Sequence, residues 1–381
     1  MPGRLRRRRA GGGGLVRESR QTTLLPLMEA AFQEAGLPRP FSLTRDLDLQ
    51  GYFECSLKQQ WELLHGAFLQ RVREMADPLD TLAHLGRQPE PMVRFFLPGV
   101  AFRLLEDRPR EALRTVRSLA GDPEYRVAEA VQAFGVRPCA QALGPDVVAE
   151  LLDWIHDPSL FLRRAAVEGC RPRGVWVRHL EWACRSPALL LPLLEPLREE
   201  RERYVANAVG NALNDVSKDH PRLVLDVAGR WLSSPPHGPQ TGRMVQKALR
   251  TLVKRGDPFA LRLFGLEELE VSVRAELLGG PRVAPNSTLV FRLEIQNEGD
   301  AGPANLVYEI STAGKHRRRP RRKRFQGGTV RLPAGATLVV TRRERIFDRR
   351  AALLLDGPGE AVFFLNGVEV ARVPFEVARV P

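Results

Sequence analysis

The stretch "VANAV" (residues 205–209) belongs to a repeated pattern that decides the fold class of this chain. Related copies are "VAEAV" (127–131), "LRRAA" (162–166) and "VQKAL" (245–249), which follow one another at separations of 35, 43 and 40 residues. In each copy an aliphatic residue is followed three positions later by Ala and then by a small or aliphatic residue. Apolar residues at this spacing form one buried stripe of a helix. A helix pair recurring at this period predicts HEAT-like repeats, which stack into a solenoid whose concave face binds partners.

After about residue 267 the apolar residues alternate with a period of two, which is typical of short strands. About seven such strands in roughly 110 residues predict an immunoglobulin-like β-sandwich. The dipeptide Asn366-Gly367 between two of them predicts a tight hairpin. We therefore expect a multidomain protein, with an all-α HEAT-like solenoid at 21–266 followed by an all-β sandwich at 267–381.

The net charge of +13 is concentrated in two short segments. Residues 1–20 contribute +6, and residues 315–324, "KHRRRPRRKR", contribute +8, so the remaining 351 residues together carry −1. Such runs are typical of polyanion binding. We expect 1–20 to be a disordered tail. Because a flat core strand cannot hold eight charges, we expect 315–324 to be a protruding loop or hairpin.

Several classes of protein are excluded by what the sequence lacks. No apolar stretch reaches the length of a membrane helix, and no apolar segment follows the N-terminal arginines as in a secretory signal. The four Cys residues are scattered, the seven His residues form no ligand pattern, and there is no P-loop, GxGxxG, HExxH or GxSxG motif. We therefore expect a cytoplasmic monomer with no metal, no cofactor and no membrane partner.

The helix expected over residues 161–167 ends in an acid, two bases and a large aromatic residue. A Gly and a Pro stop this helix within one turn, and around the stop lie Glu168, Arg171, Arg173 and Trp176. One repeat later, a second helix likewise ends in acids beside bases. Acids within a basic frame suit a cation held inside a polyanion.

A simpler interpretation of these helix ends remains open. Glu168 and Asp215 can equally serve as solvated helix caps or as ion pairs with Arg171 or Lys218. A single Trp such as Trp176 is more often part of a core than of a site.

Three stretches in the same order carry a resemblance to a known family: "RRAAVEGCRPRGVW" (163–176), "YVANAVGNALNDVSKDHP" (204–221) and "ALRTLVKRGDP" (248–258). Together they resemble the HEAT-like bacterial DNA glycosylases of alkylation repair. The similarity is greatest to the AlkC branch, in which an immunoglobulin-like domain can follow the solenoid. It covers most of the chain and is weakest over the first 90 residues.

The resemblance implies excision of positively charged N-alkylated bases, such as 3-methyladenine, from double-stranded DNA without base flipping. It implies that Glu168 and Asp215 face the damaged nucleotide, that Trp176 lies against the deoxyribose and that Arg171 holds backbone phosphate. The partner would be alkylated duplex DNA of the bacterial nucleoid. The basic residues predicted to bind this DNA are Arg171, Arg173, Lys218, Lys247, Arg250, Lys254, Arg317, Arg318, Arg319, Arg321, Arg322, Lys323 and Arg324.

One departure from the family pattern keeps two other functions open. The family tends to have "SEFAIRP" where this chain reads "QAFGVRP" (132–138), so Ala133 stands at the position of an expected carboxylate. A catalytically weak or inactive DNA-binding relative would tolerate this change. A protein-interaction scaffold, the commonest use of HEAT repeats, would need neither the acids nor the arginines at the helix ends.

Overall fold

The computed structural model shows a chain that forms two compact units. One consists of Met1–Val216 with Pro236–Met244, and the other of Ser217–Pro235 with Val245–Pro381. Each unit is described by itself. The residues that the structure describes are 13–36, 42–174, 177–235, 237–313, 320–346 and 355–378.

The first unit is helical. Its α-helices are α1 (Gly13–Glu34), α2 (Leu43–Asp48), α3 (Leu57–Arg73), α4 (Pro78–Leu85), α5 (Pro91–Leu104), α6 (Pro109–Leu119), α7 (Tyr125–Ala130), α8 (Arg137–Leu143), α9 (Val147–Ile155), α10 (Leu160–Gly169), α11 (Glu181–Arg185), α12 (Leu191–Leu194) and α13 (Arg203–Val216). A π-helical turn (η2, Val131–Val136) joins α7 to α8, and short 3-10 turns lie at Tyr52–Glu54, Gly144–Asp146, Pro187–Leu190 and Glu195–Glu199. Helix α1 begins inside the segment expected to be a tail, and residues 1–12 lie outside the described residues.

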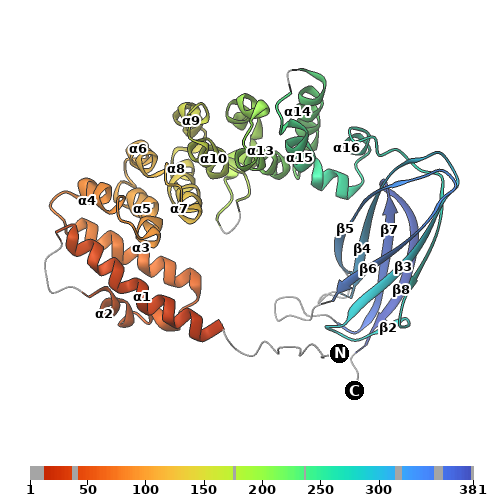
Figure 1. Ribbon diagram of the computed structural model, residues 1–381, viewed down its shortest axis with the longest axis horizontal. Coiled ribbons are helices and arrows are strands. Elements are labelled where there is room, and N and C mark those ends of the chain that lie inside the picture. The colour runs from red at the N-terminus through yellow and green to blue at the C-terminus, as the bar shows by residue number, and fades with distance from the viewer. Residues whose placement is uncertain are drawn as a thin grey trace, which may run out of the picture. The chain divides into compact units, whose positions relative to one another are not determined.

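The repeated sequence pattern lies on helices that follow one another along one side of this unit (Figure 1). The three copies in the first unit fall on α7 with η2, on α10 and on α13, and α5 packs against α7, η2 against α10, and α10 against α13. The pattern alanines Ala130, Ala165 and Ala208 are all buried, so the short side chain lets neighbouring helices approach closely. Helices α4, α6 and α9 lie on the other side.

Two arginines tie successive repeats together in the same way. The Arg94 guanidinium donates to two carbonyls just before its own helix α5 and pairs with Asp122 at 2.5 Å, just before α7. Arg163 of α10 repeats this geometry and pairs with Glu200 at 2.8 Å, just before α13. The structural repeat is therefore reproduced in its ion pairs as well as in its apolar stripe.

The second unit contains helices and a β-sandwich. Its helices are α14 (Pro221–Ser233), most of α15 (Thr241–Arg255) and α16 (Pro258–Arg262). Its strands are β1 (Val271–Leu277), β2 (Arg282–Val283), β3 (Thr288–Asn297), β4 (Gly302–Thr312), β5 (Arg321–Leu332), β6 (Thr337–Arg345), β7 (Gly357–Leu365) and β8 (Val368–Val377). One sheet has the order β1-β3-β6 and the other β2-β8-β7-β4-β5.

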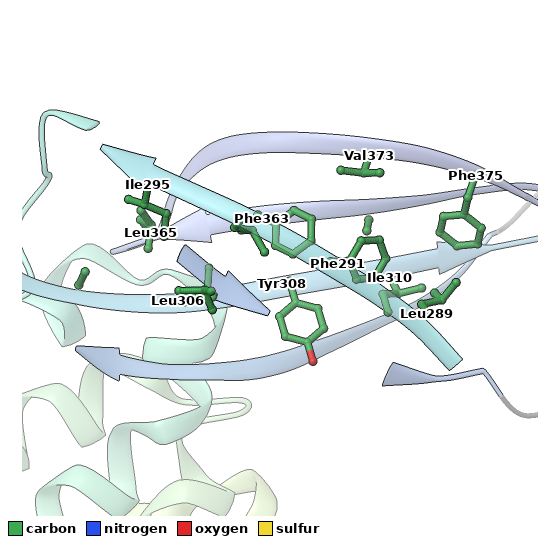
Figure 2. Close-up of a cluster of buried hydrophobic side chains, with 14 of the residues drawn as sticks. Leu289, Phe291, Ile295, Leu306, Tyr308, Ile310, Phe363, Leu365, Val373 and Phe375 are labelled. Atoms are coloured by element: carbon green, nitrogen blue, oxygen red, sulfur yellow. The ribbon is translucent and has the colours of Figure 1, made fainter. Parts of the chain in front are cut away.

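The two sheets enclose a single apolar core (Figure 2). Phe291 of β3 and Phe363 of β7 meet edge to face at 5.3 Å, so the core joins one sheet to the other. The predicted hairpin is present between β7 and β8, where Asn366 and Gly367 both have positive φ. The predicted fold class, a helical repeat followed by a β-sandwich, is confirmed.

The last helices pack tightly against the sandwich within the second unit. A Cβ added at Gly256, which follows α15, would lie 3.1 Å from the Cα of Gly367 in the β7–β8 turn. Arg324 of β5 donates to the carbonyls of Lys254 and Arg255, at the end of α15. These contacts join the end of α15 to the sandwich within the second unit.

The sequence predicts a loop or a hairpin for the basic run at residues 315–324. Residues 314–319 lie outside the described residues, but Arg321–Leu332 form strand β5. Residues 321–324 are therefore not a loop, but they pair antiparallel with the end of β4, as in the hairpin that was the other expected form. An edge strand tolerates this charge because β5 pairs on one side only, with β4, and its first three side chains are exposed. Among the described residues, no helix combines the length and apolarity needed to cross a membrane.

Candidate functional site

Two acids of neighbouring repeats meet on one arginine. Glu168 lies in the last turn of α10 and Asp215 in the last turn of α13, while Arg171 lies just after the C-cap residue of α10, Cys170. Arg171 Nη1 lies 2.9 Å from Glu168 Oε2, and Arg171 Nη2 lies 2.9 Å from Asp215 Oδ2. Arg171 Nε donates to the same Asp215 oxygen, also at 2.9 Å. A single planar guanidinium therefore fixes both carboxylates.

This acid–arginine–acid group is largely withdrawn from solvent. The side chains of Arg171, Glu168 and Asp215 are 9%, 11% and 2% exposed. Burial by itself lowers the pKa of Arg171, but the charges of Glu168 and Asp215 outweigh this effect and leave its pKa raised. The guanidinium therefore stays charged and holds the two acids at fixed positions.

A second arginine extends the network toward the preceding repeat. Arg164 Nη2 lies 3.4 Å from Glu168 Oε1, the oxygen that does not contact Arg171, and 3.2 Å from Glu129 Oε1 on α7. Arg164 also donates to the Tyr204 carbonyl at 2.7 Å, and its guanidinium stacks 4.0 Å from the centre of the Tyr204 ring. The result is an alternating series of acids and arginines that crosses three consecutive repeats, α7, α10 and α13.

A third arginine, Arg137, holds the backbone around this site. It begins α8, is almost fully buried, and donates to the carbonyls of Gly169, Arg171, Pro172 and Arg178. Burial lowers its pKa to about 10. Its partners are backbone dipoles, so its role is to shape the segment from the end of α10 to residue 178.

Sequence reasoning missed Arg137, although a signal was present. In "FGVRPCA" (residues 134–140) an arginine interrupts an apolar run whose neighbours Val136 and Cys139 are buried. A charge at such a position needs buried partners. Those partners lie more than thirty residues further along the chain, and the sequence does not reveal them.

The structure brings some predicted residues together and gives one of them a different place. Glu168 and Asp215 converge, as expected. Arg171, predicted to hold backbone phosphate, instead lies buried between the two acids, because its guanidinium balances their charge. Arg173 is partly buried in the same segment, and Trp176 lies outside the described residues.

The remaining predicted DNA-binding residues belong to the second unit. Lys218 precedes α14, and α15 carries Lys247, Arg250 and Lys254, of which Arg250 is exposed. Strand β5 carries Arg321, Arg322, Lys323 and Arg324, whereas Arg317, Arg318 and Arg319 lie outside the described residues.

Within β5 the basic residues divide by role. Arg324 pairs with Glu309 at 2.8 Å and donates to Arg255 O at 3.0 Å, so it closes the C-terminal end of α15. Lys323 lies over the Phe325 ring at 4.5 Å. Burial, followed by the charges of Lys323 and Arg324, lowers the pKa of Lys254. Positive charge therefore accumulates where β5 meets the end of α15.

No cluster of three or more His, Cys, Asp or Glu residues suited to a metal ion occurs in the described part of the chain. The arrangement is an ion-paired carboxylate site on a helical-repeat scaffold, joined in sequence to a β-sandwich that carries a basic edge strand.

Comparison with known proteins assigns the chain to a family. Residues 108–245, which include Glu168, Arg171 and Asp215, match the family described as DNA alkylation repair enzyme. The chain is 30% identical over 264 residues to the uncharacterized protein YhaZ of Bacillus subtilis (strain 168), covering 69% of this chain and 71% of that protein. The chain belongs to the DNA alkylation repair enzyme family, and the resemblance found in its sequence is confirmed.

A solved structure supports the same fold along almost the whole chain. It is the alkylpurine DNA glycosylase AlkC of Pseudomonas fluorescens, bound to DNA containing an abasic site analog. The TM-score is 0.75 at 21% identity, and the match covers 94% of this chain and 99% of that one. The succession of a helical repeat and a β-sandwich is therefore shared by the two proteins.

Proposed function

We propose that this protein is a DNA glycosylase that excises cationic N-alkylated bases, of the 3-methyladenine type, from duplex DNA without base flipping. The observation that carries the proposal is the convergence of Glu168 and Asp215 on Arg171. It lies inside the segment that matches the alkylation repair family.

Excision of a cationic base requires carboxylates near the deoxyribose, and this site contains two of them. An N3- or N7-alkylated purine is already a cation and a good leaving group, so the enzyme need not protonate it. As the N-glycosidic bond breaks, positive charge develops on the deoxyribose, and a nearby carboxylate stabilises it. A second carboxylate can orient the attacking water. In this proposal Glu168 and Asp215 fill these two roles.

The two arginines of the network serve to position the acids. The three carboxylates of Glu129, Glu168 and Asp215 alternate with the two guanidiniums of Arg164 and Arg171, and each guanidinium contacts two of the acids. Acids held in place before the substrate arrives need no reorganisation during the reaction.

Binding that does not flip the base must draw its affinity from the DNA backbone. We propose that Arg173 and the basic residues of the second unit contact phosphates, and that Trp176 packs against the deoxyribose. Binding would then weaken steeply with added salt.

One observation favours a second candidate, a DNA-binding relative without catalysis. Both proposed catalytic acids are ion-paired, and Asp215 is buried, as in a purely structural salt bridge. The two functions differ in a single outcome, the release of a base.

The test is to incubate the protein with methylated duplex DNA and to measure released bases by mass spectrometry and abasic sites by alkaline cleavage. Wild-type protein is expected to release methylated purines, and the Glu168→Gln and Asp215→Asn variants to release far less. Glu181→Gln, an exposed acid paired with Arg185, is the matched control. Specific binding of methylated DNA with no release by the wild type would establish the second candidate instead.

A further inference from the structure

The three carboxylates of the network differ in how far they face solvent. The side chain of Glu129 is 38% exposed, whereas those of Glu168 and Asp215 are 11% and 2% exposed. Glu168 and Asp215 share the Arg171 guanidinium, while Glu129 has only a share of Arg164. Glu129 is therefore the acid of this network that an incoming ligand can approach most directly.

The position of Glu129 is nevertheless well defined. Its Oε1 accepts from Arg164 at 3.2 Å and from the Tyr204 hydroxyl at 3.2 Å. Arg164 is itself held by the Tyr204 carbonyl and ring. Burial, with a contribution from Glu129, raises the pKa of Tyr204 to about 12, so this hydroxyl keeps its proton and donates at neutral pH.

Glu129 shares its arginine with a second acid of the network. Arg164 lies between Glu129 and Glu168 and divides one positive charge between them, whereas Arg171 serves Glu168 and Asp215. Ala133, in the π-helical turn that continues α7, is partly exposed and offers no charge. On this stretch of the helix, residues 125–136, the acid beside the Glu168 site is thus Glu129.

We propose that Glu129 is a specificity-determining residue that gives the site its preference for a cationic ligand over a neutral one of the same shape. This inference rests on the proposed function, since it concerns how the same site selects charged bases. A plain structural salt bridge between Glu129 and Arg164 would affect stability alone. A specificity-determining Glu129 affects discrimination by charge.

The experiment compares two abasic-site analogues in the same duplex. One carries a pyrrolidine ring, which is a cation at neutral pH, and the other carries a neutral tetrahydrofuran ring. For Glu129→Gln, the affinity for the pyrrolidine duplex is expected to fall about threefold to tenfold, the size of one partly screened charge a few ångströms away. Affinity for the tetrahydrofuran duplex is expected to stay unchanged.

Two further variants separate charge from shape. Glu129→Asp keeps the charge and is expected to retain most of the discrimination, and Glu181→Gln is the control for loss of an exposed acid elsewhere. If Glu129→Gln proves unstable in thermal unfolding, Glu129→Ala replaces it. An unchanged ratio of the two affinities, or an equal fall in both, would overturn the inference.

Base release from methylated DNA, measured in parallel, keeps this inference apart from the proposed function. Release by the wild type with no change of discrimination in Glu129→Gln would remove only the role of Glu129. Loss of discrimination in Glu129→Gln together with no release by the wild type would remove only the glycosylase function and leave a charge-selective binding site.

Discussion

The arginines around the acids of the first unit and those at the start of strand β5 differ in burial and in the contacts they make. Arg137, Arg164 and Arg171 are buried or nearly so, and each makes several hydrogen bonds to carbonyls or carboxylates. Arg321 and Arg322 of β5 are exposed at a sheet edge. Buried arginines act as positioning groups, because desolvation makes every one of their contacts necessary. Exposed ones can exchange solvent and ions for phosphate.

The largest expected effect concerns the acids that the buried arginines hold. Asp215→Asn keeps the shape of the side chain but removes its charge, and we expect the rate of base release to fall about 10²- to 10³-fold. Single-turnover kinetics on methylated duplex DNA measure this rate at saturating protein. A rate within threefold of the wild type, in a variant that folds normally, would mean that Asp215 serves only as a partner of Arg171.

Arg137 tests whether a buried arginine without an acid partner is needed for the site. Arg137→Met fills a similar volume but removes the guanidinium's hydrogen bonds to four carbonyls, three of them buried, so we expect a loss of about 3 kcal/mol in the free energy of unfolding. Urea unfolding followed by circular dichroism measures it. Arg137→Lys keeps the charge but lacks the planar guanidinium, and we expect its free energy of unfolding to lie between those of the wild type and Arg137→Met. A loss below about 0.5 kcal/mol would show that water replaces the guanidinium easily.

How far the sequence alone could predict these regions follows from the range of the interactions. The repeat helices and the Asn366-Gly367 hairpin depend on local periodicity and turn chemistry, so they were predictable. Glu168 and Asp215 were predicted as a pair because the repeat brings equivalent helix ends together. An ion pair with Arg171 was one of the open interpretations of these acids, but the burial of Arg171 between both of them depends on packing between residues 44 positions apart.

For a related reason, the sequence left open whether residues 321–324 form a loop or an arm of a hairpin. A run of basic residues predicts a loop when the strand is assumed to lie inside a sheet. Only the strand order places β5 at an edge, where Arg321 and Arg322 can face solvent. Strand order depends on contacts across the whole sandwich and cannot be read from residues 315–324 alone.

A pH effect is expected in the first unit. His65 is buried between α3 and α5, and burial lowers its pKa to about 4 from an ordinary value of 6.5. The unfolded chain therefore takes up this proton between pH 6.5 and 4 while the folded chain does not. The free energy of unfolding is intact above pH 6.5 and falls by up to about 3 kcal/mol as the pH approaches 4. Urea unfolding at a series of pH values measures this slope. His65→Leu should flatten it, and an equally steep slope in that variant would assign the effect to other groups.

The smallest expected effect concerns the exposed basic residues at the start of β5. Replacing Arg321, Arg322 and Lys323 by Gln removes three charges from the edge of β5. We expect the logarithmic salt slope of DNA binding to fall by roughly 1, with affinity about tenfold weaker at 0.1 M salt. This change in salt slope is smaller than the loss of three full phosphate contacts would give. The reason is that Arg322 already lies 3.8 Å from Glu309 and Lys323 lies over Phe325. Fluorescence anisotropy across a salt series measures both quantities.

Arg331→Gln, near the other end of β5, controls for the loss of a charge from the same strand. An unchanged slope in the triple variant would show that this edge does not meet DNA, and would leave the basic helix α15 to supply the phosphate contacts of the second unit.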